Sequence, residues 1–484
     1  MKRSFYVLVL LLLQSYLFGG NTFVKTIGGA DDDVIYDGLV ANNNYYFFGY
    51  TRSFGNNMDG YILKLADNGT VLTEKAIDLG QDELFHSAVM TPEGDFLVVG
   101  YTRQNESSPT DVLIVKLTKD FNVQWSKTIG GDKNDNAYTI QPLPDGNYIV
   151  SGSTHSFGAG DEDVYLIKIN SRGDTLWSTT FGGTREDEGR RCAVNKQGQI
   201  FVTAKSVGLF STPDMYMIKT DTNGSALWLK TFSSMGWTEG YDVCTVDTCA
   251  VFAGYGYWGS GYSHDILLVK VNAHGDTMFT RHYGGSADDY AFGICPTHDG
   301  GFVLTGKSHS FGYSFDGFLC RVDTNGNLQW FYGFGGDKDD IFWNVLETPD
   351  HYFIALGFTS SNTAGGTDAF IVKTDSLGLT TALEQSPIHV PQTIALGQNY
   401  PNPFNPTTTI PFTLDKAQNV TIEIFSSTGK KIAILGKRKF PAGNHILSWN
   451  GRDAQGMVQP SGIYFYRLVM DGHVVAVRKM ILMR

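Results

Sequence analysis

The sequence predicts an all-β protein in which a seven-bladed β-propeller is followed by a small β-sandwich. Three observations predict this fold class: the composition, a repeat of about fifty residues, and a change in sequence character after residue 383. Of the 484 residues, 56 are glycine and 13% are aromatic, but only 18% are charged. This profile is typical of β proteins with many tight turns, and the length is enough for two or three domains.

The repeat is the strongest pattern in the chain. An aspartate is followed five residues later by a basic residue at seven places, each 51 or 52 residues after the last. A phrase resembling Lys-Thr-Phe-Gly-Gly, first seen at residues 25–29, recurs with the same period. The Asp and Lys or Arg positions are Asp59/Lys64, Asp111/Lys116, Asp163/Lys168, Asp214/Lys219, Asp265/Lys270, Asp316/Arg321 and Asp368/Lys373. We interpret them as blade-to-blade ion pairs or turn caps.

Each repeat reads as four strands. In the third repeat, residues 137–143 and 147–153 flank a Pro-Asp-Gly turn, and residues 163–170 and 175–181 flank a second glycine turn. β-branched and aromatic runs separated by such turns indicate hairpins. Seven units of four antiparallel strands predict a seven-bladed propeller, and this region, residues 21–383, resembles bacterial secreted propeller repeat proteins.

The ends of the repeat region indicate how the ring closes. The last unit lacks a fourth strand, whereas residues 22–27 form a strand without a unit of its own. Phe23 occupies the position of a tryptophan found in four other repeats, at Trp125, Trp177, Trp228 and Trp330. We therefore expect the N-terminal strand to complete the last blade and remove its free edge. The longer connections should share one face, where a ligand site is expected.

Residues 1–20 predict a secretory signal peptide. Lys2 and Arg3 precede an apolar run from Phe5 to Leu13, which is shorter than the roughly 20 residues needed to span a bilayer. The alternative, a membrane anchor, requires a longer run. We expect no membrane span in the mature protein.

The repeat pattern ends near residue 383, and a different sequence pattern follows. Residues 384–393 contain Pro387 and Pro391 and predict a linker. Short alternating strands with Gly-rich turns then predict a small immunoglobulin-like β-sandwich over residues 394–484. The segment Gln398-Asn-Tyr-Pro-Asn-Pro-Phe-Asn-Pro406, together with residues 442–445, 449–453, 461–464 and 479–482, resembles the C-terminal sorting domain of the type IX secretion system and related modules of flagellar hook-capping proteins. The motif residues are Asn399, Pro401, Asn402, Pro403, Phe404, Asn405 and Pro406.

The resemblance implies a route for the chain. In that family the domain engages the outer-membrane secretion machinery after periplasmic transit, so the protein is expected to be secreted or displayed on the outer surface of a bacterium. A sandwich without a sorting role is the alternative, because fold does not fix function.

The five cysteines do not form a disulfide framework, because their number is odd and their spacing wide. Only Cys244 and Cys249 are expected to face each other, across a hairpin turning at residues 245–248. The pattern contains no CxxC pair of a zinc site.

Charge separates the two regions. From residue 393 on, 11 basic residues face 4 acidic ones, whereas residues 21–392 carry 24 basic and 45 acidic residues, a net charge of −21. So acidic a propeller is a poor nucleic-acid partner. Its interblade acids suggest calcium as the one cofactor to consider, and otherwise no cofactor is expected. The candidate ligands are Asp31, Asp33, Asp337 and Asp340. Because such aspartates recur in most blades, loop capping is the favoured interpretation.

Departures from the repeat are the better guide to a ligand site. The loops of the fifth blade carry Trp237, Tyr257, Trp258 and Tyr262, and the fourth blade carries Arg190. Clustered aromatic rings with polar neighbours stack on sugars or anchor proteins, or they simply fill a glycine-rich loop. We therefore predict a ligand site here for an extracellular glycan or protein.

No catalytic residue is predicted, since no nucleophile elbow, HExxH or phosphate-binding loop is present. A secreted or cell-surface binding module is the first hypothesis. A polysaccharide hydrolase or lyase, which needs two acids in one cleft, and a structural envelope protein are the alternatives.

Overall fold

The structure is a computed structural model. It describes residues 22–380 except 56, 208–211, 234–235, 258–262, 286 and 311–313, and residues 395–483 except 398, 400–401, 415–417, 428, 441–442, 454 and 471–472. The predicted signal peptide and linker lie outside these residues. Within them, no helix is long and apolar enough to cross a membrane.

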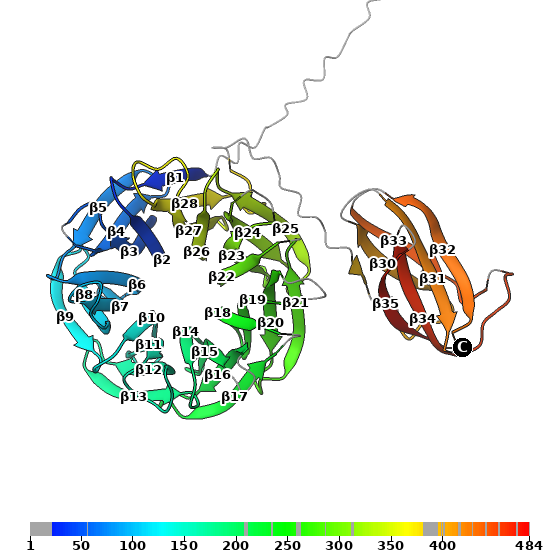
Figure 1. Cartoon of the computed structure of the whole chain (residues 1–484), viewed down its shortest axis with the longest axis horizontal. Coiled ribbons are helices and arrows are strands. Elements are labelled where there is room, and N and C mark those ends of the chain that lie inside the picture. The colour runs from blue at the N-terminus through cyan, green and yellow to red at the C-terminus, as the bar shows by residue number, and fades with distance from the viewer. Residues whose placement is uncertain are drawn as a thin grey trace, which may run out of the picture.

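Seven four-stranded antiparallel sheets form a ring, as predicted (Figure 1). Blade 1 contains β2 (Asp33–Ala41), β3 (Asn44–Thr51), β4 (Asp59–Ala66) and β5 (Val71–Ile77). Blade 2 contains β6 (Asp82–Met90), β7 (Phe96–Arg103), β8 (Asp111–Leu117) and β9 (Val123–Ile129). Blade 3 contains β10 (Asp135–Pro142), β11 (Tyr148–Thr154), β12 (Asp163–Ile169) and β13 (Thr175–Phe181). Blade 4 contains β14 (Asp187–Val194), β15 (Ile200–Val207), β16 (Pro213–Thr220) and β17 (Ala226–Phe232). Blade 5 contains β18 (Thr238–Val246), β19 (Cys249–Tyr257), β20 (His264–Val271) and β21 (Thr277–Tyr283). Blade 6 contains β22 (Asp289–Pro296), β23 (Phe302–Ser308), β24 (Asp316–Val322) and β25 (Leu328–Phe334). Blade 7 contains β26 (Asp340–Glu347), β27 (Phe353–Thr359), β28 (Asp368–Thr374) and β1 (Phe23–Ile27).

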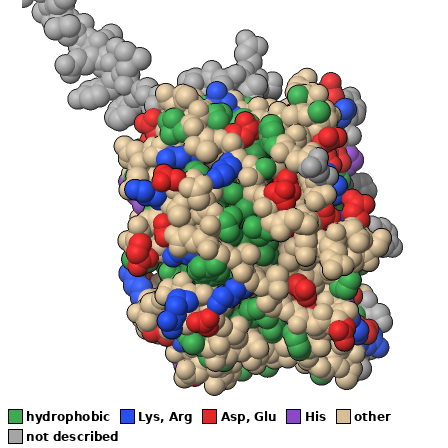
Figure 2. Space-filling view, turned by 90° about the vertical axis from the view of Figure 1, so that its left-hand side faces the viewer, with side chains coloured by type: hydrophobic (Ala, Val, Ile, Leu, Met, Phe, Trp, Pro, Cys, Tyr) green, Lys and Arg blue, Asp and Glu red, His purple; other side chains and the backbone are tan. Residues whose placement is uncertain are grey.

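The core of the propeller lies between the blades. The middle strands β11 and β12 are buried along their whole length, whereas the outer strand β13 contains only exposed and half-buried residues. A sheet covered on both faces needs nearly continuous apolar strands, which is the pattern that these sequences carry. Val99 and Ile114 of blade 2 pack in one cluster with Val150 and Ile167 of blade 3. Figure 2 shows one side of the molecule, where charges of both signs are interspersed with hydrophobic side chains.

The N-terminal strand closes the ring, which confirms the prediction. β1 pairs antiparallel with β28, from Phe23 opposite Lys373 to Ile27 opposite Ala369. The Asp32 carboxylate then accepts hydrogen bonds from the amide and the hydroxyl of Thr367, at 2.8 and 3.0 Å. Closure gives the seventh blade its fourth, outer strand and covers the edge of β28.

The repeated Asp and Lys do not pair with each other, because they lie near opposite ends of one strand. The Asp163 carboxylate accepts hydrogen bonds from the backbone of Ala159 and Gly160 in the preceding loop. Lys168 donates to Asp145 of its own blade, at 2.6 Å, and to the carbonyl of Thr222 in the next blade. The pair therefore fastens a loop at one end of the strand and the neighbouring blade at the other.

The cysteine expectation was wrong. All five thiols are free, and Cys249 lies opposite Val246 while Cys244 lies opposite Val251. The hairpin turns at residues 247–248, whereas a Cys244–Cys249 pair would require a turn over residues 245–248. The two side chains therefore occupy different rungs of the ladder.

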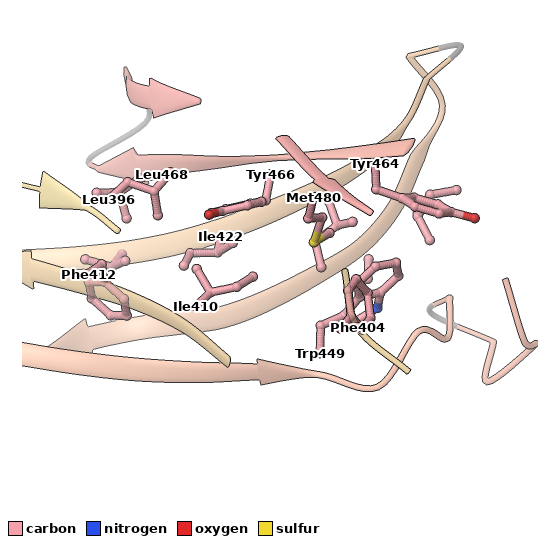
Figure 3. Close-up of a cluster of buried hydrophobic side chains, with 14 of the residues drawn as sticks. Leu396, Phe404, Ile410, Phe412, Ile422, Trp449, Tyr464, Tyr466, Leu468 and Met480 are labelled. Atoms are coloured by element: carbon pink, nitrogen blue, oxygen red, sulfur yellow. The ribbon is translucent and has the colours of Figure 1, made fainter. Parts of the chain in front are cut away.

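The C-terminal region is a two-sheet β-sandwich. One sheet contains β29 (Ala395–Leu396), β30 (Thr408–Leu414) and β33 (Gly443–Trp449), and the other contains β32 (Lys431–Phe440), β31 (Gln418–Ser426), β34 (Gly462–Met470) and β35 (His473–Leu482). Figure 3 shows their shared core, in which Trp449, Phe404 and Met480 meet. Eighteen buried residues form this cluster, which gives the domain a hydrophobic core of its own.

Candidate functional site

A ring of seven side chains surrounds the centre of the propeller. Every inner strand contains a shift in its pairing with the second strand, and the extra residue at that shift is a β-bulge. A bulge places one residue outside the ladder and re-aims its side chain. In blade 4 the shift spans both Arg190 and Arg191, and Arg190 is the one that contacts the neighbouring bulge residues. We call the set the bulge ring: Tyr36, His86, Tyr138, Arg190, Tyr241, Phe292 and Trp343.

The members of the bulge ring contact one another around the full circle. Arg190 lies between two aromatic rings, 5.6 Å from the centroid of Tyr138 and 4.5 Å from that of Tyr241. The other centroid distances are 4.8 Å for Tyr36–His86, 5.0 Å for His86–Tyr138, 4.8 Å for Tyr241–Phe292, 4.8 Å for Phe292–Trp343 and 5.5 Å for Trp343–Tyr36. One cation is therefore held among six aromatic side chains by stacking and cation–π contacts.

The bulge ring lines a cavity of about 300 Å³, which also borders Leu84, Tyr101 and Arg191. Leu84 lies near the start of β6 and Tyr101 lies opposite it on β7. The starts of the inner strands carry the long connections, so the cavity lies toward the face on which we predicted a ligand. A volume of this size is at the lower end of small-molecule sites.

Two buried donors in this cavity are unsatisfied. Neither Arg190 Nε nor Trp343 Nε1 donates a hydrogen bond to any of the described residues. Buried N–H groups without an acceptor are rare in proteins, because a donor that loses its hydrogen bond to water and gains none in the protein destabilises the fold. These two N–H groups belong to side chains that line the cavity, and neither has a protein partner among the described residues.

The histidine of the bulge ring is neutral at physiological pH. Burial, together with the charges of Arg191 and Arg190, lowers the pKa of His86 from 6.5 to about 3. A neutral imidazole both donates and accepts a hydrogen bond, and it does not repel the nearby guanidinium groups.

Two glutamates, Glu188 and Glu239, each lie two residues before a member of the bulge ring, and both are already paired. Glu188 accepts hydrogen bonds from Arg190 and contacts Lys205, at 2.8 and 3.1 Å. Glu239 accepts from Trp237 Nε1 and from the Tyr255 hydroxyl, at 2.7 and 2.8 Å. Neither is placed as a free acid or base, so these carboxylates orient cations and rings beside the cavity.

The residues predicted from the fifth blade lead outward from the cavity. Tyr257 stacks on His264 at 4.2 Å, and Trp237 meets the same imidazole edge-on at 6.1 Å. His264 contacts Tyr290, and Tyr290 contacts Tyr255, with centroids 5.2 and 4.5 Å apart. Tyr255 then reaches Tyr241 of the bulge ring at 5.6 Å. The predicted Trp258 and Tyr262 lie outside the described residues.

Two of the four predicted metal candidates, Asp33 and Asp340, cap loops, whereas Asp31 and Asp337 are exposed. Asp33 accepts hydrogen bonds from the Gly29 amide and from the Ser53 hydroxyl, both at 2.7 Å, and also from Thr51. Asp340 accepts from the Gly336 amide at 2.7 Å. The described residues contain three groups with three or more metal-ligand atoms close together, and none includes Asp31, Asp33, Asp337 or Asp340. Calcium at these four residues remains a prediction.

The sequence analysis missed six of the seven members of the bulge ring. Each lies three residues after the residue that caps its interblade loop, as Tyr36 follows Asp33 and Tyr138 follows Asp135. All seven are large aromatic or basic residues at this one position. That fixed spacing was visible, but the bulge that turns the position inward was not.

The sorting motif is part of the sandwich core. The Asn399 amide donates to the Tyr466 hydroxyl at 2.8 Å, and the Phe404 amide donates to the carbonyl of Ile481 at 3.0 Å. Phe404 is buried against Trp449, with centroids 5.6 Å apart. Asn402 Oδ1 accepts from the Ile481 amide, so the motif is fastened to the last strand of the chain. Pro403, Asn405 and Pro406 complete this segment, and Pro401 lies outside the described residues.

These features define an exported β-propeller protein with a C-terminal sorting domain. Residues 398–483 match the family model described as the secretion system C-terminal sorting domain. The match confirms the resemblance found in the sequence and makes this a secreted or cell-surface protein. Among curated proteins, none matches the chain.

Solved structures with similar propellers are distant. PorZ, an essential surface component of the type-IX secretion system of Porphyromonas gingivalis, is 12% identical with a TM-score of 0.37, and the match covers 92% of this chain and 69% of PorZ. Sqt1 from Chaetomium thermophilum is 13% identical with a TM-score of 0.43, over 96% and 100% of the two chains. The propeller domain of the trilobed protease from Pyrococcus furiosus is 12% identical with a TM-score of 0.39, over 76% and 99%. Such low scores carry no conclusion about function.

Proposed function

We propose that the propeller is a glycan-binding module that takes one sugar residue of an extracellular glycan into the cavity of the bulge ring. The observation that carries this proposal is the pair of unsatisfied donors, Arg190 Nε and Trp343 Nε1, on two side chains that line a cavity with aromatic walls. Sugars offer many oxygen acceptors together with apolar C–H faces, which is the combination that these two donors and six rings complement.

The outward path of rings supports recognition of more than one sugar residue. Trp237 is 37% exposed, and it continues through His264 and Tyr255 to the bulge ring. A chain of sugars leaving the cavity toward blade 5 would therefore meet further aromatic faces. Arg190 is paired with Glu188, but a second guanidinium group, that of Arg191, also lines the cavity. Two guanidinium groups at one site favour glycans that carry a carboxylate.

Binding is favoured over hydrolysis by the state of the nearby acids. Glycosidases use two carboxyl groups that flank the scissile bond. Glu188 and Glu239 are instead fully engaged with Arg190, Lys205, Trp237 and Tyr255. This arrangement supports a rigid recognition site.

The test is calorimetric titration of the mature full chain with neutral and uronate-containing oligosaccharides selected by an array. Trp343→Phe keeps an aromatic side chain at this position and removes the Nε1 donor. We therefore expect affinity for the oligosaccharide to fall about 5- to 100-fold, which corresponds to the loss of one buried hydrogen bond. Arg190→Met should weaken uronate binding more than neutral binding. Trp177→Phe is the matched control, because Trp177 Nε1 is also buried and unsatisfied but lies on outer strand β13.

Two outcomes would contradict the proposal. Equal effects of Trp343→Phe and Trp177→Phe would show that the cavity is not the binding site. Release of oligosaccharide products during incubation would make the protein a hydrolase or lyase instead.

A further inference from the structure

We propose that His298, Glu347 and His351 form a binding site for one divalent transition-metal ion, with zinc as the reference ion, between blades 6 and 7. This site lies in the short hairpin turns, at the opposite ends of the inner strands from the long connections. It is independent of the glycan proposal.

The three ligand groups come together from two blades. His298 lies in the β22–β23 turn, Glu347 ends β26, and His351 lies in the β26–β27 turn. Glu347 Oε1 is 2.7 Å from His298 Nδ1 and 3.4 Å from His351 Nδ1. The two imidazoles stack with centroids 3.5 Å apart, and all three ligand atoms lie within 4.8 Å of one another. Both histidines thus turn the same ring nitrogen toward one carboxylate oxygen.

The carboxylate is held in place while the histidines remain accessible. The side chain of Glu347 is 12% exposed, whereas those of His298 and His351 are 44% and 49% exposed. Glu347 Oε2 accepts a hydrogen bond from the His298 backbone amide at 2.8 Å. An oriented carboxylate with an open approach from solvent is suited to capture an ion.

The other blades serve as an internal comparison, because five inner hairpins share the same turn. The position of His298 holds proline or lysine elsewhere, and the position of Glu347 holds Met, Pro or Val. The equivalent residues are Pro92, Pro144, Lys196 and Pro349 for His298, and Met90, Pro142, Val194 and Pro296 for Glu347. Departures from the repeat at three different positions therefore converge on one point.

The third departure carries a conformational cost. His351 has φ of 62°, in the left-handed region, where the other four turns use glycine with φ between 79° and 85°. The four glycines are Gly94, Gly146, Gly198 and Gly300. A non-glycine residue in this region costs on the order of 1 kcal/mol or more, and such strain concentrates at functional sites. Placing a histidine here is explained if its imidazole serves as a ligand.

The donor set selects the class of ion. Two imidazole nitrogens and one carboxylate suit zinc and related transition metals, whereas calcium prefers oxygen ligands alone. Three protein ligands leave at least one position for water or another ligand. Because the ligands come from two blades, the ion would also join blade 6 to blade 7. The two remaining groups, Glu162 with Glu186 and Glu188, and Asp59 with Asp78 and Glu83, are acidic clusters and carry no such inference.

The experiment titrates the mature full chain, without a histidine tag and after treatment with chelator, with zinc chloride by calorimetry. We expect one zinc per chain at this site and a higher melting temperature in its presence. His351→Gly restores the residue of the other turns, and His298→Pro restores the residue of blades 2, 3 and 7. Each removes a direct ligand, so each should lower zinc affinity by more than the about 10- to 100-fold that loss of a ligand-orienting residue costs, and should abolish the zinc-dependent rise in melting temperature.

Folding is controlled in the same experiment. His351→Gly should be at least as stable as the wild type without zinc, because it relieves the left-handed strain. His274→Asn removes an exposed turn histidine of blade 5 and should leave zinc binding unchanged. Unchanged affinity in His351→Gly, or no stoichiometric zinc binding by the wild type, would overturn the proposal.

Discussion

At the scale of single residues, the bulge position sets what the centre of the propeller presents. A bulge recurs at this position in all seven blades, and the side chain that it carries differs from blade to blade. The six aromatic side chains of the bulge ring form most of the cavity wall, and Arg190 and Arg191 add two positive charges to it. Specificity at such a site resides in individual substitutions rather than in the fold.

His86 gives a pH dependence that can be measured. Its pKa is about 3 in the folded protein and about 6.5 when exposed, so the unfolded chain binds the proton first as pH falls. Its contribution to the free energy of unfolding is therefore complete above pH 6.5 and declines toward pH 3, by at most about 1.4 kcal/mol per pH unit. His86→Phe keeps an aromatic ring and should remove this decline.

The measurement is urea unfolding of wild type and His86→Phe between pH 7 and pH 4. The difference between the two proteins isolates His86 from the buried Asp242, whose pKa is raised to about 6 chiefly by burial and which acts in the opposite direction. His274→Asn should follow the wild type. Parallel curves for wild type and His86→Phe would refute the expectation.

At the scale of elements, the N-terminal strand β1 closes the ring by pairing with the last strand of the propeller, β28. Phe23 is buried, its ring lies against Gly69 of blade 1, and its strand pairs with β28 of blade 7. Gly69 has φ of 78°, and a Cβ there would meet the Phe23 ring at 2.7 Å. The aromatic side chain and the bare turn therefore fit together across the seam.

Phe23→Ala should lower the free energy of unfolding by about 3–5 kcal/mol, the range for truncating a buried phenylalanine. Urea unfolding of the full chain measures this, with the propeller transition followed separately from that of the sandwich. Val71→Ala is the control, since Val71 is 42% exposed on outer strand β5 and should change stability by less than about 0.5 kcal/mol. Equal losses for both variants would mean that the seam contributes no special stability.

At the scale of the whole molecule, the chain carries two units with different tasks and opposite charge. Residues 21–392 have a net charge of −21, whereas the region from residue 393 on carries 11 basic and 4 acidic residues. The sorting domain encloses its own core of buried residues, and its motif is fastened to the last strand. Sorting is therefore expected to require the folded sandwich rather than a short exposed peptide.

A chain that ends at residue 392 should be retained inside the outer membrane in a host that carries the secretion system. Cell fractionation and surface labelling measure the distribution of the protein between periplasm, surface and medium. Phe404→Ala, which truncates a buried core residue, should also cause retention, whereas Met457→Ala at a 63% exposed position should not. Surface delivery of the shortened chain would show that another segment carries the signal.

The sequence alone determined the seven repeats, the four strands of each, the closing strand and the sorting domain. These features follow from local patterns: alternating residues, glycine turns and a period of about fifty, all of which act over short distances along the chain. The same patterns led from the fifth blade to Trp237 and Tyr257, which the structure joins to the cavity through Tyr255.

Only the tertiary structure decided where the sites lie. Tyr36 and Trp343 are more than three hundred residues apart, and they meet because the ring closes and bulges turn both side chains to its centre. His298 and His351 become neighbours because adjacent blades align their turns. Cys244 and Cys249 miss each other by the register of one hairpin. The physical reason is common to all three: side-chain direction depends on backbone register and closure, which a sequence pattern does not encode locally.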